Sequence, residues 1–313
     1  MASTRRVVAI IAVTGVAVLV AAALVLVLGL RGNGRDAPGT AGAGINEPGQ
    51  AATGSSSVRP GTGSAAGQAG PLSASAAAYL AGRHGTVLAA VYDVRTGKTW
   101  QLGDGPVQPE ASVVKLDILE TLLARPQGAA LSPPDQALAR SMIEDSDNDA
   151  ATSLWDEDGG APGLTYYGDR AGLTQTTPSQ CVTCAGFAWP GWGLSTTVPE
   201  DQLTLLKQLV VPGASPLLSR SARSYALSLM EHVTAGQRWG ISGGVPAGVT
   251  VALKDGWLPL DAAATNWQVN SVGWVYGDSR DYLIAVLSTG NPTEQYGIAT
   301  ISALSSLVWN AMR

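Results

Sequence analysis

An uninterrupted apolar segment near the amino terminus is the feature that most constrains the fold of this chain. From Val7 to Leu30 there are 24 consecutive uncharged residues, and about 20 helical residues are enough to cross the hydrocarbon core of a bilayer. Secretory signal segments are usually shorter, with an apolar stretch of about 7 to 15 residues before a small-residue cleavage site. Here Arg31 and Arg35 follow at once. We therefore interpret residues 1–31 as an uncleaved signal anchor, a single transmembrane helix with the remaining chain on the extracytoplasmic side.

Residues 32–71 differ sharply in composition from what precedes and follows them. They are mostly Gly, Ala, Ser, Thr and Pro, with almost no aliphatic side chains, so they cannot bury enough surface to offset the entropy of ordering. We predict a disordered linker. As a flexible coil of 40 residues, it would hold the next domain about 35 Å from the membrane.

Charge and rare residues exclude several classes of function. The chain has 19 Lys and Arg against 24 Asp and Glu, which removes the electrostatic basis for binding nucleic acid. It has two histidines and two cysteines, so a tetrahedral Cys/His zinc site would require all four of them. No HExxH, Walker or dinucleotide-binding glycine motif is present. The sequence therefore predicts no metal and no cofactor.

The globular part, residues 72–313, has strand patterns at both ends and helical patterns between them. Helical patterns also begin and end this part, at residues 73–82 and 296–312. Period-two and apolar runs predict strands at residues 86–94, 99–102, 248–253, 268–276 and 281–287. Capping boxes at Ser132 and Thr197 predict helices in the middle. The fold class is therefore α/β in the α+β sense: one five-stranded antiparallel sheet, flanking terminal helices and an all-helical subdomain, with a catalytic cleft between the sheet and the subdomain.

Three short motifs carry the candidate chemistry. In Ser112-Val-Val-Lys115 the serine and lysine share a helix face. The hydroxyl is then placed as a nucleophile among unpaired N–H groups, and a desolvated lysine can act as its base. The alternative is a helix-start serine beside a solvated lysine, and this motif alone is weak evidence.

The second motif is Ser146-Asp147-Asn148. Its hydroxyl can relay a proton to a leaving group and its carboxamide can hold a substrate amide, whereas the alternative is a helix-capping turn. The third motif, Lys254-Asp255-Gly256-Trp257, follows an apolar strand. Its glycine permits close backbone approach to a ligand beside a positive charge, whereas the alternative is a turn at the end of a strand.

In this order the motifs resemble the SxxK, SDN and KTG triplet of the class A β-lactamases and their penicillin-binding relatives, and the predicted fold agrees with that family over residues 73–313. The resemblance implies that Ser112 is the acylated nucleophile, Lys115 its base and Ser146 a proton shuttle. It implies that Asn148, Lys254, Asp255, Gly256 and Trp257 contact the substrate. The backbone N–H groups of Ser112 and Trp257 would form the oxyanion hole.

Departures from the family pattern are equally informative. The family's deacylating glutamate lies on the loop after the SDN helix, but residues 170–199 contain no Asp or Glu. Asp255 replaces the usual Thr or Ser, which would place a negative charge where the family's substrates carry a carboxylate. The segment between Lys115 and Ser146 is shorter than usual, so a more open cleft is expected. We expect a membrane-anchored serine hydrolase of the bacterial cell envelope that acts on β-lactams, D-alanyl peptides or related amides and esters and is a poor β-lactamase. The alternative is a non-hydrolytic penicillin-binding or cell-wall ligand sensor.

Three further patterns allow more than one interpretation. Residues 170–199, which contain no Asp or Glu, are called the acid-free loop. Cys181 and Cys184 lie in this loop, where an extracytoplasmic disulfide is favoured over two free thiols. Beside them, Phe187, Trp189 and Trp192 form either local packing or a substrate platform. A GxSxG pattern at Gly240–Gly244 lacks the strand, helix and later histidine of an α/β-hydrolase, so Ser242 is predicted to lie in a turn.

Overall fold

The computed structural model describes residues 70–125, 131–214 and 216–312. The predicted anchor of residues 1–31 and nearly all of the predicted linker lie outside the described residues. None of the described helices is long and apolar enough to span a bilayer.

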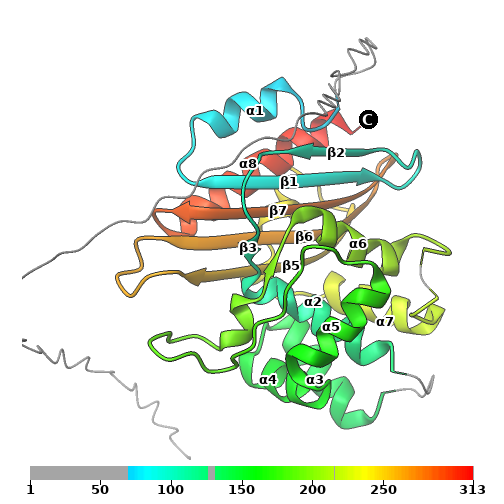
Figure 1. Cartoon of the computed structure of the whole chain (residues 1–313). Coiled ribbons are helices and arrows are strands. Elements are labelled where there is room, and N and C mark those ends of the chain that lie inside the picture. Colours follow the sequence, from blue (N-terminus) through cyan, green and yellow to red (C-terminus); the bar gives the residue numbers. More distant parts are fainter. Residues whose placement is uncertain (1–69, 126–130, 215, 313) are drawn as a thin grey trace, which may run out of the picture. The chain divides into compact units, whose positions relative to one another are not determined.

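A five-stranded antiparallel sheet forms the centre of the described chain, which confirms the predicted fold class (Figure 1). Its spatial order is β2-β1-β7-β6-β5, so strands from both ends of the sequence meet where β1 pairs with β7. The strands are β1 (Thr86–Asp93), β2 (Thr99–Leu102), β5 (Thr250–Pro259), β6 (Trp267–Gly277) and β7 (Arg280–Asn291). A second, two-stranded sheet pairs β3 (Gln108–Pro109) with β4 (Thr196–Thr197).

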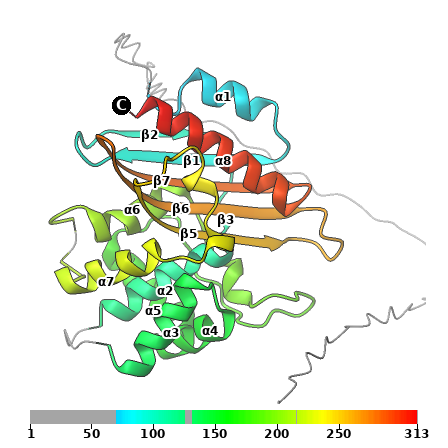
Figure 2. The same ribbon diagram turned by 180° about the vertical axis from the view of Figure 1, so that it is seen from behind.

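Helices cover both faces of the main sheet. Figure 2 shows α8 (Glu294–Ala311) crossing one face with α1 (Ala74–Ala81) beside it. On the other face α6 (Pro199–Val210) packs against β1 and β7. The remaining helices form the helical part beyond the β5 edge: α2 (Val114–Leu123), α3 (Pro133–Glu144), α4 (Asn148–Glu157), α5 (Gly160–Ala171) and α7 (Arg220–Glu231). The site motifs lie where this helical part meets β5.

Local sequence explains most of these boundaries. Ser132 caps α3, since its side chain accepts a hydrogen bond from Asp135 N, and two prolines follow in the first turn. Thr293 caps α8 in the same way through Tyr296 N. Strand β1 is buried along most of its length because it is covered on both faces. The core elements therefore begin and end where capping and burial dictate.

Two local predictions are wrong for identifiable reasons. Thr197 does not cap α6, whose N-cap is Val198 without a side-chain bond, because the Thr197 hydroxyl is engaged by Thr176 and Gln202 instead. Strand β5 does not end at Leu253 but continues to Pro259, paired with β6 throughout. Lys254 to Trp257 therefore lie inside a strand rather than in a turn.

Candidate active site

Ser112 lies in a short 3₁₀ turn, Ala111–Val113, that leads directly into α2. Ala111 has a positive φ of 51°, a left-handed conformation that costs a non-glycine residue about 1 kcal/mol or more. Surrounding contacts hold the turn in place: Glu110 N donates to Ser195 O at 2.7 Å, and Asn270 Nδ2 donates to Glu110 O at 2.8 Å. The half-buried serine is thus presented on a fixed, strained turn.

Gly256 brings strand β5 onto this turn. A Cβ at position 256 would lie 2.6 Å from Ser112 N and 2.7 Å from Val113 N, both of which are backbone atoms that cannot rotate away. Only glycine permits this approach, which places the outer strand of the sheet beside the backbone N–H of Ser112.

Lys115 is buried in the first turn of α2 and is bonded to the second motif. Its Nζ lies 2.6 Å from Ser146 O, 3.0 Å from Ser146 Oγ and 2.8 Å from Asn148 Oδ1. Burial lowers the pKa of Lys115 to about 6, and the charge of Lys254 acts in the same direction. At neutral pH the amine is therefore mostly uncharged and able to accept a proton.

Lys254 approaches the same hydroxyl from the sheet. Its Nζ donates to Ser146 Oγ at 3.0 Å and to Asp255 O at 2.9 Å. Burial lowers the pKa of Lys254 to about 8, while the charge of Asp255 opposes this shift. Ser146, whose φ of 55° also lies in the left-handed region, thus has its hydroxyl at equal distances from two buried amines.

The second motif, Ser146-Asp147-Asn148, both contacts Lys115 and caps a helix. Asp147 is the N-cap of α4, and its side chain accepts from Ala150 N at 2.7 Å. Ser146 and Asn148, on either side of it, both contact Lys115. The side chain of Ser112 itself makes no hydrogen bond within the described residues, so Lys115 is bonded to the second motif rather than to the serine.

Asp255 lies away from the cleft, contrary to expectation. Its carboxyl group is fully buried, accepts a hydrogen bond from Ser271 Oγ on β6, and accepts another from Trp239 N at 3.0 Å. Burial raises the pKa of Asp255 to about 8, against the opposing effect of these two bonds and of Lys254. The carboxyl group therefore does not line the cleft and presents no negative charge there.

An open cleft lies beside Ser112. Its lining residues come from the serine turn, the second motif, the acid-free loop, the 3₁₀ turn Ala235–Gln237 and β5. They are Ala111, Ser112, Ser146, Asn148, Trp189, Pro190, Trp192, Gly193, Gln237, Trp257 and Leu258. None of these residues carries a formal charge. Lys115, Lys254 and Gly256 lie behind the lining and hold it in place.

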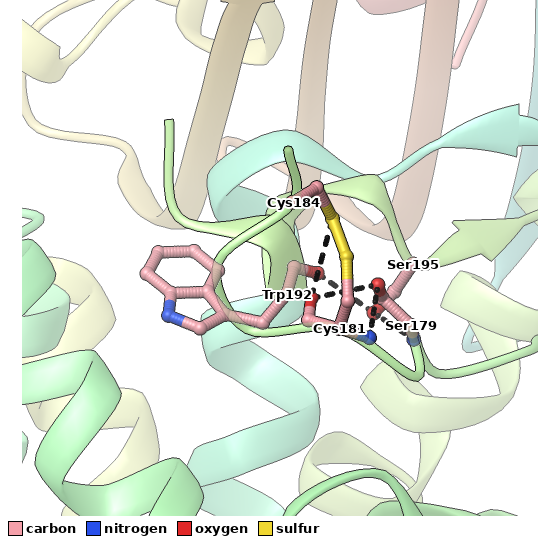
Figure 3. Close-up of a disulfide and its surroundings, with 5 residues drawn as sticks. All are labelled: Ser179, Cys181, Cys184, Trp192 and Ser195. Atoms are coloured by element: carbon pink, nitrogen blue, oxygen red, sulfur yellow. Dashed lines mark hydrogen bonds between the residues drawn. A yellow bond between two sulfur atoms is a disulfide. The ribbon is translucent and has the colours of Figure 1, made fainter. Parts of the chain in front are cut away.

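The acid-free loop contributes one wall of the cleft, and a disulfide between Cys181 and Cys184 closes it locally (Figure 3). Gly191 is required beside the disulfide, because a Cβ there would lie 2.6 Å from Cys184 Sγ. Ser195 Oγ donates to Trp192 O at 2.7 Å and accepts from Ser179 N at 2.9 Å. The loop is therefore cross-linked locally by the disulfide and by the Ser195 hydroxyl.

Of the three aromatic residues in this loop, two reach the cleft. Trp192 is buried, its Nε1 donates to Thr152 Oγ1 at 3.1 Å, and Lys115 Nζ lies 5.1 Å from the centre of its ring. Trp189 is 37% exposed on the same wall, whereas Phe187 is not among the lining residues. Trp192 is therefore packed locally, and Trp189 lies exposed on the cleft wall, so a role of Trp189 as a substrate platform stays a prediction.

Several buried carboxyl groups behind the serine turn were not predicted from the sequence. Asp201 accepts hydrogen bonds from Thr174 N and Gln175 N and so anchors the start of the acid-free loop. Glu110 and Asp117 lie together, and burial raises the pKa of both, that of Asp117 to about 7. Their apolar surroundings in the sequence gave no signal that these side chains would converge. Within the described residues no three His, Cys, Asp or Glu side chains are arranged to hold a metal ion.

Ser242 lies in a short 3₁₀ turn, Gly240–Ser242, where its hydroxyl donates to Arg238 O at 3.3 Å. It does not line the cleft. Gln237, which no pattern singled out, does line it, and its Nε2 donates to Asp145 O at 2.7 Å.

Comparisons with solved structures agree with the fold. The extended-spectrum β-lactamase TLA-1 superimposes with a TM-score of 0.63 at 18% identity, covering 76% of this chain and 96% of that one. A class A β-lactamase from Mycobacterium abscessus gives a TM-score of 0.60 at 21% identity, covering 75% and 96%. An ancestral class A β-lactamase gives 0.63 at 22% identity, covering 76% and 98%.

Sequence comparisons identify the family. A Mycobacterium tuberculosis protein named "Putative lipoprotein LppW" is 30% identical over 224 residues, which are 69% of this chain and 67% of that protein. The same match is found in Mycobacterium bovis. The Beta-lactamase enzyme family matches residues 121–312, a span that begins after Ser112 and Lys115. With its sheet, helices and cleft arranged as described above, this chain belongs to the β-lactamase enzyme family, a family of serine hydrolases.

Proposed function

We propose that the chain is a membrane-anchored, extracytoplasmic serine hydrolase that forms an acyl-enzyme on Ser112. The observation that carries this proposal is the Ser146 hydroxyl, 3.0 Å from both Lys115 Nζ and Lys254 Nζ at the edge of the cleft that Ser112 lines. Two amines sharing one hydroxyl beside a half-buried serine can receive a proton on one side and deliver it on the other.

In the acylation step the Ser112 Oγ attacks the substrate carbonyl carbon and the new C–O bond forms. The Oγ proton passes to the uncharged Lys115 amine once the substrate has tightened the site, since catalytic hydrogen bonds are often long before substrate binds. The negative charge on the carbonyl oxygen is stabilised by the N–H groups of Ser112 and Trp257. The bond to the leaving group then breaks, and the leaving group takes its proton through Ser146.

Deacylation is expected to be slow. No Asp, Glu or His is among the residues that line the cleft, so the acyl-enzyme has no carboxylate beside it to activate water. The ring of Trp192, rather than a carboxylate, lies near the Lys115 amine. We therefore expect a poor β-lactamase whose acyl-enzyme lasts longer than that of an efficient one.

The membrane location rests on the sequence. The apolar run of Val7 to Leu30 is long enough to span a bilayer, and the linker that follows would hold the enzyme near the membrane surface. The name of the mycobacterial relative, a lipoprotein, is consistent with envelope attachment. Detergent-dependent extraction of the full-length chain, compared with a chain lacking residues 1–31, tests this part.

The second candidate is a non-hydrolytic penicillin-binding or cell-wall ligand sensor. It is favoured by the absence of a hydrogen bond from Ser112 to Lys115 and of a charged residue lining the cleft. In that case Ser112 binds or is acylated without turnover.

Intact-mass measurement after incubation with benzylpenicillin decides between these candidates. The wild type is compared with Ser112→Ala and with Ser242→Ala, a matched control that removes another partly buried serine outside the cleft. An adduct on wild type and Ser242→Ala but not on Ser112→Ala supports acylation of Ser112; slow decay of that adduct to the free mass supports the hydrolase, and an adduct that does not decay supports the non-hydrolytic candidate. An adduct that persists in Ser112→Ala contradicts the mechanism, and the absence of any adduct moves the test to the ester substrates described below.

A further inference from the structure

The walls of the cleft beside Ser112 are aromatic and aliphatic. Trp189, Pro190 and Trp192 form one wall on the acid-free loop, and Trp257 and Leu258 form the other on β5. Trp257 is held from behind by Trp239, with ring centres 5.8 Å apart. Where the walls meet, a Cβ on Gly193 would lie 3.5 Å from Leu258 Cδ2. A flat ring entering the cleft would therefore find indole surface on both sides.

The basic side chains nearest to the cleft are already engaged in hydrogen bonds. Lys115 and Lys254 are fully buried and bonded to Ser146, Asn148 and carbonyl oxygens. Arg238, in the turn before β5, donates to Glu231 O at 3.0 Å and to Val251 O at 2.8 Å. Among the described residues, no guanidinium or ammonium group is therefore presented to a carboxylate in the cleft, and a carboxylate bound there would lose its hydration without gaining a salt bridge.

Asp255 and the residue opposite it in the sheet also offer no binding group for a carboxylate. Asp255 pairs in register with Ser271 on β6, and their side chains bond to each other in the interior. Neither residue offers a positive charge or a free hydroxyl to the cleft, because the serine hydroxyl is donated to the carboxyl group and also accepts from Ile241 N at 2.9 Å.

We infer that the site selects an uncharged acyl donor with an aromatic acyl group and discriminates against donors whose acyl group carries a carboxylate. This inference rests on the proposed acylation at Ser112 and specifies its substrate class. Asn148 and Ser146 supply the polar contacts to the reacting carbonyl and leaving group, and the tryptophan walls take the ring.

Three p-nitrophenyl esters test the inference by the release of nitrophenolate: the phenylacetate, the 4-carboxyphenylacetate and the acetate. The first two differ only in the carboxylate, and the first and third differ in the ring. We expect kcat/KM for the phenylacetate to exceed that for the 4-carboxyphenylacetate by about tenfold or more, and to exceed that for the acetate as well.

Variants of Trp189 test whether the ring contacts the loop wall. This side chain is 37% exposed, so its replacement leaves the core intact. Trp189→Ala is expected to lower the ratio of phenylacetate to acetate about three- to tenfold, and Trp189→Arg to raise the ratio of 4-carboxyphenylacetate to phenylacetate. Tyr166→Ala removes an aromatic ring that is 66% exposed and outside the cleft, and it is expected to leave both ratios unchanged.

The outcomes separate this inference from the proposed function. Ser112→Ala is measured with all three esters, and release that depends on Ser112 supports acylation whichever ester is preferred. If that release is as fast with the carboxylated ester as with the phenylacetate, or if Trp189→Ala leaves the ring preference intact, the inferred substrate class is wrong and the serine mechanism stands. If no ester shows release that depends on Ser112, the proposed acylation fails and the substrate class fails with it.

Discussion

Gly256→Ala tests whether the close approach of β5 to the serine turn is needed for activity. The added Cβ would lie 2.6 Å from Ser112 N and 2.7 Å from Val113 N, and an ordinary contact requires about 3.4 Å. Strand and turn must therefore separate by 3.4 − 2.6, or about 0.8 Å. A misplacement near 1 Å in a catalytic site costs about a hundredfold in rate, and overpacking of this kind costs about 1 to 3 kcal/mol of stability.

The assay is the rate of acylation of Ser112, followed by intact mass or by the first turnover of the p-nitrophenyl ester. Gly236→Ala is the matched control, because no atom lies within 4 Å of a Cβ at that position. We expect Gly256→Ala to fold with a lowered melting temperature and to acylate about a hundredfold more slowly, with Gly236→Ala close to wild type in both. Acylation of folded Gly256→Ala at the wild-type rate would refute the argument that this contact sets the geometry of the oxyanion site.

Three further predictions concern the amines, Asp255 and the disulfide. The acylation rate is expected to rise with pH through about 6, the pKa of Lys115. Lys115→Arg, whose side chain stays charged, should acylate about a hundredfold or more slower than the wild type. A flat pH–rate profile of the wild type contradicts the role of Lys115 as base. Burial raises the pKa of Asp255 from 3.8 to about 8, so between these pH values the folded state binds more protons than the unfolded state. The stability of the wild type relative to Asp255→Asn should therefore fall as the pH rises from about 4 to about 8. Melting curves of both proteins across this range check the sign. Cys184→Ser should lower stability by about 2 kcal/mol, as expected for so short a loop, and raise KM for the aromatic ester because the Trp189 wall is loosened; an unchanged KM would separate the disulfide from the cleft.

The parts of the structure that could be predicted from sequence are those fixed by local patterns. Apolar alternation located all five strands of the main sheet, and the order of the three motifs indicated which segments would meet. Ser112 and Lys115 are three apart on one helix start, so their proximity needs no long-range information. The fold class was also predictable, because local patterns located its strands and helices.

The remaining features depend on contacts that a single sequence does not display. Lys254-Asp255-Gly256 has the composition of a turn, but ten residues of β6 pair with β5 from Thr250 to Pro259, and this pairing keeps the segment extended. The orientation of Asp255 depends on Ser271, which lies opposite it only once that register is set. Thr197 has a capping sequence, yet its hydroxyl is taken by Thr176 from a distant segment. In each case a tertiary partner outweighed a local preference.

The two amines around Ser146 give the site a direction for proton transfer. The pKa of Lys115 is about 6 and that of Lys254 about 8, so between these values one amine is uncharged and the other carries a proton. The charged Lys254 can only donate to the Ser146 hydroxyl, so the hydrogen of that hydroxyl can move toward the leaving group while the lone pair of Lys115 stays available for the Ser112 proton. The charge of Lys254 also disfavours protonation of Lys115, because a second like charge near one hydroxyl raises the cost of adding a proton. The uncharged state of Lys115, which acylation requires, is therefore maintained in part by Lys254, a residue of strand β5.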